Sequence, residues 1–325
     1  MQLNRIGGTD VQVSALSFGC ASIGNLYRAV SDDQARAVLH RAWDAGIRYF
    51  DTAPHYGRGR SEQRLGRFLS QYPREAYVLS TKAGRVLSPG APLHAADGFV
   101  DPLPNAVRYD YSGDGLEASL EHSLDLLQTS HIDILYVHDI GTYTHGPDNA
   151  AHMEAFLGSG YERLVRLRER GRIRAFGLGV NENGVCLDVM RHGAIDVILL
   201  AGRLTLLDRS AEEELTAMCR AQGTSLVLGG VFNSGILATG PVDGATYDYQ
   251  EAGPDIMRRV KDLHSKAQAM GVPLATAALH FAVRHPLAAS VLLGTARAAS
   301  LERNLAALQA EMPEEFDRIF AREPL

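Results

Sequence analysis

Four polar side chains in the first half of the sequence could carry out proton-transfer chemistry together. Asp51 ends the apolar stretch IRYFD, Tyr56 follows five residues later, Lys82 ends AYVLSTK, and His138 ends IDILYVH. Three of them therefore stand where a short segment rich in β-branched and aromatic residues gives way to a loop. If these segments are parallel strands, their carboxyl ends meet at one rim, and we expect the four side chains to lie together.

Such a group suits proton transfer to or from an alcohol or carbonyl oxygen. A free phenol has a pKa of about 10 and is a poor base at neutral pH, but a neighbouring ammonium stabilises the phenolate. A carboxylate beside the lysine keeps that ammonium charged, and a histidine can hydrogen-bond the reacting oxygen. Each residue alone could also be structural, as a turn cap, a packed tyrosine, a solvated lysine or a core histidine. Their joint occurrence at successive segment ends favours catalysis.

Other reaction classes find less support in the sequence. No serine or cysteine nucleophile stands beside an evident base, which argues against acyl transfer. Cys20, Cys186 and Cys219 are far apart without C-x-x-C spacing, and we interpret them as reduced thiols. The eleven histidines other than His138 form no cluster such as H-E-x-x-H, so we expect no metal site.

The segments that would position these residues alternate between two patterns. Eight short apolar runs are predicted as strands, at residues 13–19, 47–51, 76–82, 132–138, 173–179, 195–202, 224–230 and 289–294. Amphipathic stretches between them are predicted as helices, at residues 31–46, 115–128, 162–171, 211–222, 255–270, 274–284 and 298–308. In the first helix, Ser31 and Gln34 suit a capping box, and Gly46 suits the C′ position.

Eight predicted strands in order, most of them followed by a predicted helix, indicate a (β/α)8 barrel of the α/β class. The alternative is a doubly wound open sheet, which usually carries G-x-G-x-x-G after its first strand. Here that turn reads GCASIGN, with glycines only at Gly19 and Gly24, and this favours the barrel. No linker divides the chain, so we expect one domain over residues 1–325. Residues 1–12 are expected to form a hairpin that closes the barrel bottom.

The composition of the chain limits the classes of molecule that it is expected to bind. The chain has 325 residues, 46% of them hydrophobic, with a net charge of −6 and a pI near 6.1. No basic stripe indicates a nucleic acid, and no window approaches the roughly 20 apolar residues of a membrane span. The start MQLNRIGGTD lacks the apolar run of a secretory signal. We expect a cytoplasmic protein, a monomer or small homo-oligomer, that acts on a small molecule.

The four polar residues, together with the motif FDTAPHYG, carry a family resemblance. The sequence resembles the aldo-keto reductase superfamily from LNRIGGTDVQVSALSFG to LLGTARAASLERNLAAL, nearly its whole length. The resemblance implies a (β/α)8 barrel with a nicotinamide cofactor extended across its C-terminal mouth. It also implies that Tyr56 is the proton donor or acceptor, with Asp51, Lys82 and His138 around it. Hydride would pass directly between nicotinamide C4 and the substrate carbon.

The resemblance also assigns a cofactor site, mainly in the loops after the last two strands. The loop VLGGVFNSGILATG would let backbone amides approach a pyrophosphate, although it could also be an ordinary flexible loop. Residues expected at the cofactor are Gly19, Asp51, Asn181, Gly229, Gly230, Asn233, Gly235, Leu237, Gly294, Thr295, Arg297, Ser300 and Asn304.

The choice between NAD and NADP depends on the turn GTARAASLERN. Relatives that use NADP commonly have K-S at its start and an arginine five residues after the serine. Gly294, Thr295 and Ser300 occupy those positions here, so both charges that would hold a 2′-phosphate are missing. The expected cofactor is therefore NAD. Arg297 stands nearby and could partly replace those charges, so NADP also stays open.

The chain departs from the common family pattern around the nicotinamide. The usual G-V-S-N after the fifth strand is replaced by GLGVNEN, which leaves Asn181 as the candidate for the carboxamide, offset by one residue. Ala201 replaces the usual glutamine of the sixth strand. Gly229 replaces the tyrosine that often stacks on nicotinamide. These changes concern how nicotinamide binds rather than the class of reaction.

Within the family, FDTAPHYGRGRSEQRLG, LYVHDIGTYTHG and GLGVNE are most similar to one group. It contains D-threo-aldose 1-dehydrogenases (L-fucose dehydrogenases), pyridoxal 4-dehydrogenases and L-galactose dehydrogenases. The similarity implies NAD-linked oxidation of the hemiacetal carbon of an aldose such as L-fucose, L-galactose or D-arabinose to the lactone. Pyridoxal oxidation, general NADP-dependent aldehyde or ketone reduction, and a regulatory barrel without catalysis are the alternatives.

Substrate selection is expected from the loops over the barrel mouth. Two are long, residues 83–113 and residues 139–158, and both are rich in polar and aromatic residues that suit a hydroxylated ring. Residues expected at the substrate are His55, Tyr56, Tyr111, His138 and Asp139.

Overall fold

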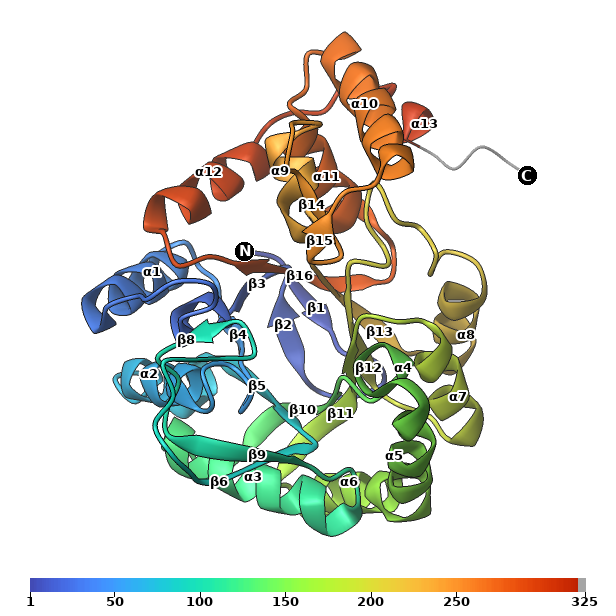
Figure 1. Ribbon diagram of the computed structural model, residues 1–325. Coiled ribbons are helices and arrows are strands. Elements are labelled where there is room, and N and C mark those ends of the chain that lie inside the picture. Colours follow the sequence, from blue (N-terminus) through green and yellow to red (C-terminus); the bar gives the residue numbers. More distant parts are fainter. Residues whose placement is uncertain (321–325) are drawn as a thin grey trace.

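Eight parallel strands form a closed barrel in the computed structural model, which describes residues 1–320 (Figure 1). The predicted (β/α)8 barrel is confirmed, and the open sheet is excluded because the last barrel strand pairs with the first. The domain predicted over 1–325 includes residues 321–325, which lie outside the described part. The barrel strands are β3 (Leu16–Gly19), β4 (Tyr49–Asp51), β5 (Val78–Ala83), β10 (Ile132–His138), β11 (Ile173–Val180), β12 (Val197–Ala201), β13 (Ser225–Gly229) and β16 (Ala288–Gly294).

Helices surround the barrel and bury their apolar faces against it (Figure 1). The first begins with the predicted capping box, because the Ser31 side chain accepts a hydrogen bond from the Gln34 amide and the Gln34 side chain accepts one from the Ser31 amide. Between residues 1 and 320, every helix is too short or too polar to cross a bilayer. The larger helices are α1 (Asp32–Asp44), α2 (Arg60–Leu69), α3 (Gly113–Leu127), α6 (Tyr161–Glu169), α7 (Gly184–His192), α8 (Glu214–Gln222), α10 (Pro254–Ala269), α11 (Leu274–Arg284) and α12 (Ala298–Leu308).

A hairpin of β1 (Leu3–Arg5) and β2 (Gln12–Ser14) closes the amino end of the barrel, and in Figure 1 it crosses the centre of the ring. Ile6, Val11 and Val13 are fully buried in one apolar cluster with side chains of the barrel interior. The Gly7 amide donates to Ser225 Oγ, at the start of β13, over 2.8 Å. The predicted closure is confirmed. The hairpin takes residues 12–14, so the first barrel strand starts three residues later than predicted.

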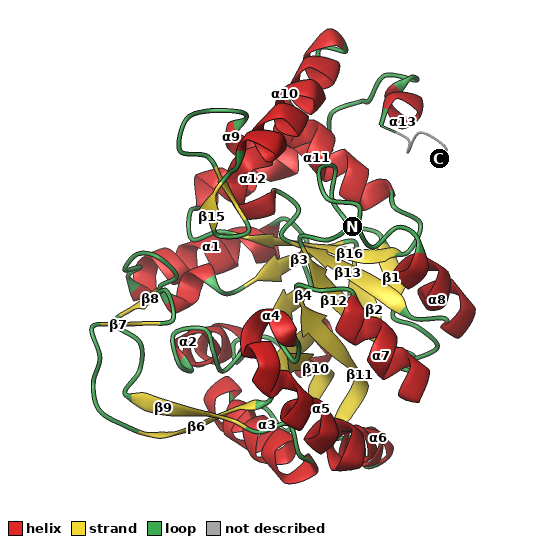
Figure 2. Cartoon of the chain, turned by 45° about the vertical axis from the view of Figure 1, so that its right-hand side comes forward, coloured by secondary structure: helices red, strands yellow, loops and turns green. Residues whose placement is uncertain are grey.

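Both long segments expected as loops contain regular structure. Residues 83–113 include a hairpin of β6 (Arg85–Pro89) and β9 (Asn105–Tyr109), which lies beside α3 in Figure 2. A smaller hairpin of β7 (Ala95–Ala96) and β8 (Phe99–Val100) stands at its tip. The second segment contains α4 (Thr142–His145) and α5 (Asn149–Ala155). Two further elements follow β13, the short helix α9 (Ile236–Thr239) and a hairpin of β14 (Thr246–Tyr247) and β15 (Gln250–Glu251). A last helix, α13 (Phe316–Ile319), ends near the limit of the described chain.

We predict that the amino-terminal hairpin contributes stability through its buried apolar side chains. Ile6→Ala should lower the free energy of unfolding by about 2–4 kcal/mol, because a fully buried side chain leaves a cavity. Leu3→Ala is the matched control, since Leu3 is 55% exposed in the same hairpin and should cost under about 0.5 kcal/mol. Urea unfolding followed by circular dichroism measures both. Equal losses of unfolding free energy in the two variants would contradict a stabilising role of the buried side chains of the hairpin.

Candidate active site

The strand registers bring the predicted residues to one rim of the barrel. Asp51, the last residue of β4, pairs with Ser80 of β5, and Lys82 lies two residues further along β5. Lys82 in turn pairs with Tyr136 of β10, the strand that ends at His138. Parallel neighbours thus deliver a carboxylate, an ammonium and an imidazole to the same carboxyl-terminal mouth.

A buried ion pair forms the centre of the site. Lys82 Nζ donates to Asp51 Oδ2 over 2.6 Å and to the Thr52 carbonyl over 2.8 Å, and both charged side chains are almost fully buried. Ser80 Oγ donates to the other carboxylate oxygen over 2.7 Å. Burial would lower the pKa of Lys82, but the facing Asp51 and Tyr56 outweigh this and raise that pKa above its usual value. Lys82 is therefore a fixed cation at neutral pH.

Tyr56 lies over this cation. The Lys82 ammonium is 4.7 Å from the centroid of the Tyr56 ring. Gly24 lets the first loop press against this turn, because a Cβ there would come 2.8 Å from the Tyr56 carbonyl carbon. Burial raises the pKa of the Tyr56 phenol, and Lys82 opposes that rise. The predicted effect of the lysine has the expected sign, but burial exceeds it, so the phenol is protonated at neutral pH.

Two neutral histidines face the phenol. The His138 ring stands edge-on to Tyr56 with centroids 5.9 Å apart. The centroid of the His55 ring lies 6.2 Å from that of Tyr56 and 5.7 Å from that of His138. Burial, with Arg85 and Lys82 nearby, holds the pKa of His138 well below its usual value. Burial and the same two cations lower the pKa of His55 to about 3. Neutral imidazoles can donate a hydrogen bond to a substrate oxygen without adding charge.

These groups open into one cavity of about 300 Å³. Of the predicted residues, His55, Tyr56, Lys82, His138, Asp139 and Asn181 line it, and so does Ala201 at the end of β12. Asp51 does not line the cavity, but its carboxylate accepts a hydrogen bond from Lys82, which does. The other lining residues were not predicted: Ala21, Leu26, Tyr27, Asp97, Phe99, Gly179, Val180, Leu199 and Tyr249.

Sequence reasoning missed a second ion pair at this cavity. Arg85, buried at the start of β6, donates to Asp139 Oδ2 over 2.5 Å. The same carboxylate oxygen lies 3.4 Å from His138 Nε2. Burial raises the pKa of Asp139, and Arg85 opposes the rise. Nothing in the sequence indicated Arg85, because it lies in a segment that was expected to be a loop. Only the folding of that segment into a hairpin brings Arg85 to the cavity.

Tyr111 does not line the cavity, although it was expected to contact substrate. Its ring is fully buried, and its hydroxyl donates to the His138 carbonyl over 2.8 Å. The same hydroxyl lies 2.8 Å from His145 Nε2. Tyr111 therefore supports the backbone of the strand end behind His138, and its place in the site is corrected accordingly.

The expected cofactor residues lie around the ends of β13 and β16. Gly229 ends β13, and Gly230 and Gly235 follow with φ of +60° and +103°, values that favour glycine. A Cβ on Gly230 would come within 3.0 Å of the Gly202 amide nitrogen, so the backbone is closely packed there. At the rim, Gly19 pairs with both Asp51 and Gly294.

The start of α12 is suited to an anion. Arg297 is its N-cap residue, no side chain caps it, and its first turn contains no acid. Helix starts attract negative charge, so an uncapped start beside an arginine favours a phosphate group. Thr295 Oγ1 accepts from the Arg297 amide over 3.1 Å. Ser300 and Asn304 lie on the same helix. These residues fit a phosphate-bearing nicotinamide cofactor.

Two expected cofactor residues are already engaged within the chain. Asn233 Nδ2 donates to the Gly202 carbonyl over 3.0 Å, and its Oδ1 accepts from Thr205 over 2.5 Å. The Leu237 side chain is fully buried in the apolar cluster under α10 and α11. Their side chains thus hold the loop in shape, and any contact with a cofactor falls to the backbone.

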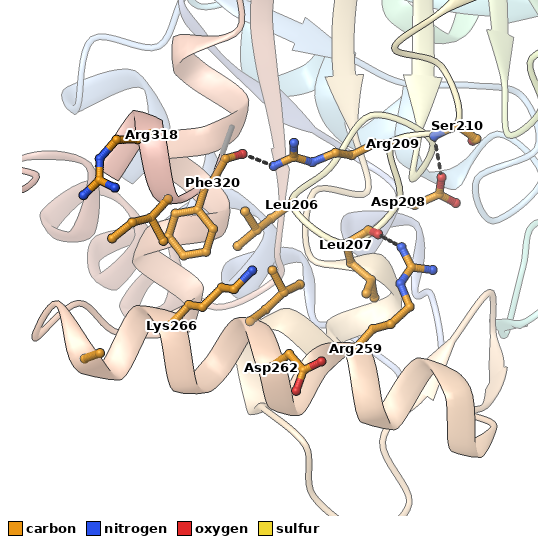
Figure 3. A pocket seen from close by; sticks show the side chains of 13 residues that line it. Leu206, Leu207, Asp208, Arg209, Ser210, Arg259, Asp262, Lys266, Arg318 and Phe320 are labelled. Carbon is orange, nitrogen blue, oxygen red and sulfur yellow. Dashed lines mark hydrogen bonds between the residues drawn. The ribbon is translucent and has the colours of Figure 1, made fainter. Parts of the chain in front are cut away.

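A larger cavity of about 1220 Å³ lies between α10, α13 and the segment after β12 (Figure 3). It shares no lining residue with the cavity of Tyr56. In Figure 3, Arg209 reaches the Phe320 carbonyl and Arg259 reaches the Leu207 carbonyl. Size alone therefore does not locate the chemistry, and the smaller cavity is the candidate active site.

The fold and this site define a class of enzyme. The sequence profile of the Aldo/keto reductase family matches residues 15–320, so the chain belongs to that family and is an oxidoreductase. Members of the family use nicotinamide cofactors and act on small molecules.

Individual relatives cover nearly the whole chain. It is 40% identical to a pyridoxal 4-dehydrogenase of Microbacterium luteolum, over 96% of this chain and 94% of that one. It is 38% identical to a D-threo-aldose 1-dehydrogenase of a Pseudomonas species, over 93% and 91%. Among solved structures, an aldo-keto reductase from Bacillus halodurans in its holo form matches with a TM-score of 0.77 and 25% identity, over 98% and 95%.

We predict that Tyr56→Phe lowers kcat by at least about 10²-fold, the lower scale of general acid–base catalysis. The phenyl ring keeps the packing against Phe99 and His138 and removes only the proton-carrying oxygen. Cofactor affinity should change little, which fluorescence titration can verify. Tyr72→Phe is the control, because Tyr72 stacks on Trp43 away from the site. Turnover like that of the wild type in Tyr56→Phe would refute the assignment.

Proposed function

We propose that this enzyme oxidises the hemiacetal carbon of a cyclic aldose to the lactone, with NAD as the cofactor. The observation that carries the proposal is the buried Asp51–Lys82 pair beneath Tyr56, at the floor of a cavity lined by two neutral histidines. A bound nicotinamide ring supplies the acceptor for the hydride that leaves the anomeric carbon.

The protein's own residues manage the proton. As the C–H bond breaks, the anomeric hydroxyl loses its proton to the phenolate form of Tyr56, whose share of the enzyme grows as the pH rises, and the C=O bond of the lactone forms. Lys82 stabilises the phenolate that accepts this proton, while Asp51 holds the ammonium in place. His138 donates a hydrogen bond to the reacting oxygen and orients it. In the reverse direction, the protonated phenol is the donor.

Hydroxyl recognition is assigned to Asp139 and His55. Asp139 presents a carboxylate to the cavity, fixed by Arg85, and a carboxylate accepts hydrogen bonds from sugar hydroxyls. The cavity stands at the lower end of the usual range for small-molecule pockets, about 300–1,000 Å³, which suits a single ring. Pyridoxal is the second candidate, favoured by Phe99 beside His55 and Tyr56 and by the relative named for that substrate.

A substrate panel tests the proposal directly. Purified enzyme is mixed with NAD and L-fucose, L-galactose, D-arabinose or pyridoxal, and the absorbance of reduced cofactor is followed. We expect turnover with at least one aldose and a lactone product by mass spectrometry. Activity confined to pyridoxal would select the second candidate. No turnover of any member, with the cofactor bound, would contradict the proposal and favour a regulatory barrel.

We predict that kcat/KM favours NAD over NADP by at least about tenfold. Two missing charge-assisted contacts, each worth roughly 1.5 kcal/mol, would give about a hundredfold. Two nearby cations can partly replace the missing charges and so reduce this figure. Arg297 is the N-cap residue of α12, and Arg303 donates to Ser300 Oγ over 2.9 Å. Arg303 was not predicted, since it becomes a neighbour of Ser300 only through the helix turn.

Variants at these positions test the prediction in both directions. Gly294→Lys combined with Ser300→Arg should move the preference toward NADP, because both missing cations return. A wild-type enzyme that prefers NADP would contradict the prediction. In that case Arg303→Gln identifies the cause, since it should abolish the preference if Arg303 binds the 2′-phosphate. Equilibrium binding of both cofactors accompanies the kinetics, so that affinity and turnover are separated.

A further inference from the structure

Two tyrosines that line the active-site cavity leave most of their surface exposed. Tyr27 is 66% exposed and Tyr249 is 61% exposed, yet both line the cavity of Tyr56. They come from distant parts of the chain, the loop after β3 and the turn between β14 and β15. A large aromatic side chain gains most when it is covered, so two such rings beside the catalytic cavity are suited to contact with a bound ring.

Both tyrosines are also held in an unfavourable backbone conformation. Their φ angles are +60° and +64°, in the left-handed region that bulky residues rarely adopt. Most other residues with positive φ here are glycine, asparagine or aspartate, which tolerate that region. Strain of this kind persists where the surrounding structure enforces it, and it gathers at ligand sites.

The surroundings do enforce it. The Tyr27 amide donates to the Gly98 carbonyl over 2.8 Å, which ties the first loop to the turn between β7 and β8. The Tyr249 amide donates to Ser234 Oγ over 3.0 Å. Next to it, Asp248 accepts two hydrogen bonds from Arg203, at 3.1 and 2.8 Å. Several tertiary contacts thus hold the backbone of both exposed tyrosines in place.

The two rings belong to one site with the catalytic phenol. Tyr27, Tyr56 and Tyr249 all line the same cavity of about 300 Å³. The Phe99 ring, from β8, lies 6.1 Å from the Tyr56 ring between centroids, and it also lines the cavity. Asp139 and His138 provide the polar groups of the same cavity.

We propose that Tyr27 and Tyr249 form an aromatic clamp that closes on the flat face of the substrate ring and makes the enzyme select cyclic over open-chain substrates. The inference rests on the proposed function, since it concerns the substrate of that same site. Aromatic rings pack on the C–H face of a pyranose or on a pyridine ring, whereas a short open-chain aldehyde offers no such face. Polar groups deeper in the cavity then read the hydroxyls.

The test compares Tyr27→Asn and Tyr249→Asn with the wild type in two reactions: oxidation of a cyclic substrate with NAD, and reduction of glyceraldehyde, a short open-chain aldehyde, with NADH. For the cyclic substrate, kcat/KM should fall about tenfold in each variant, mainly through KM. For glyceraldehyde it should change less than about twofold. The melting temperature should stay constant or rise, because asparagine tolerates positive φ. Gln128→Asn is the control: Gln128 has φ of +55° at the end of α3, away from the cavity, and its kinetics should not change.

Binding separates the clamp from the chemistry. In the Tyr56→Phe background, calorimetric titration with L-fucose, L-galactose and pyridoxal should show weaker binding of a ring once Tyr27 or Tyr249 is replaced. This result would support the clamp even if the proposed oxidation failed. A lower melting temperature with equal losses for both substrates would show that the tyrosines are structural. Unchanged ring kinetics and binding, or no ring binding by the parent protein, would overturn the clamp.

Discussion

The buried ion pair between Lys82 and Asp51 is the interaction on which the site depends. Removing two charges from water costs several kcal/mol each, and only close geometry with further hydrogen bonds offsets this. Here the 2.6 Å contact, the Ser80 hydroxyl and the Thr52 carbonyl supply that geometry. It exists because β4 and β5 are parallel neighbours that end at the same rim. Every proposed step at Tyr56 relies on this pair, since the cation stabilises the charge that the phenol acquires.

The two ends of the barrel have different roles: the amino end contributes stability, and the carboxyl end holds the candidate active site. At the amino end, an apolar hairpin fills the interior, and buried Asp133 accepts hydrogen bonds from Arg74 and Arg174. At the carboxyl end, strained backbone and exposed aromatic rings surround the cavity, as at Tyr27 and Tyr249. In this fold the active site usually lies at the carboxyl-terminal face of the barrel, whereas the amino-terminal face contributes stability.

The sequence predicted features that follow from local pattern, and missed those that arise from tertiary placement. Eight apolar runs defined the barrel because each strand is covered on both faces, and their ends located Asp51, Lys82 and His138. The helix at 184–192 was not predicted, although it follows the fifth strand as the fold requires. Arg85, Tyr27 and Tyr249 were missed because loops carry them, and only hairpins and crossing contacts bring them to the cavity. Tyr111 was placed at the substrate because sequence cannot show that its ring turns into the core.

The most direct test of the central claim is the pH dependence of oxidation when the ion pair is removed as a unit. The double variant Asp51→Asn with Lys82→Met leaves no unpaired buried charge, and circular dichroism verifies its fold. Without the cation, the phenol pKa should rise further, so less phenolate exists at any given pH. The rising limb of kcat/KM against pH should therefore move to higher pH by about one unit or more, with residual activity increasing toward alkaline pH. A folded double variant whose pH profile and rate match those of the wild type would contradict the account.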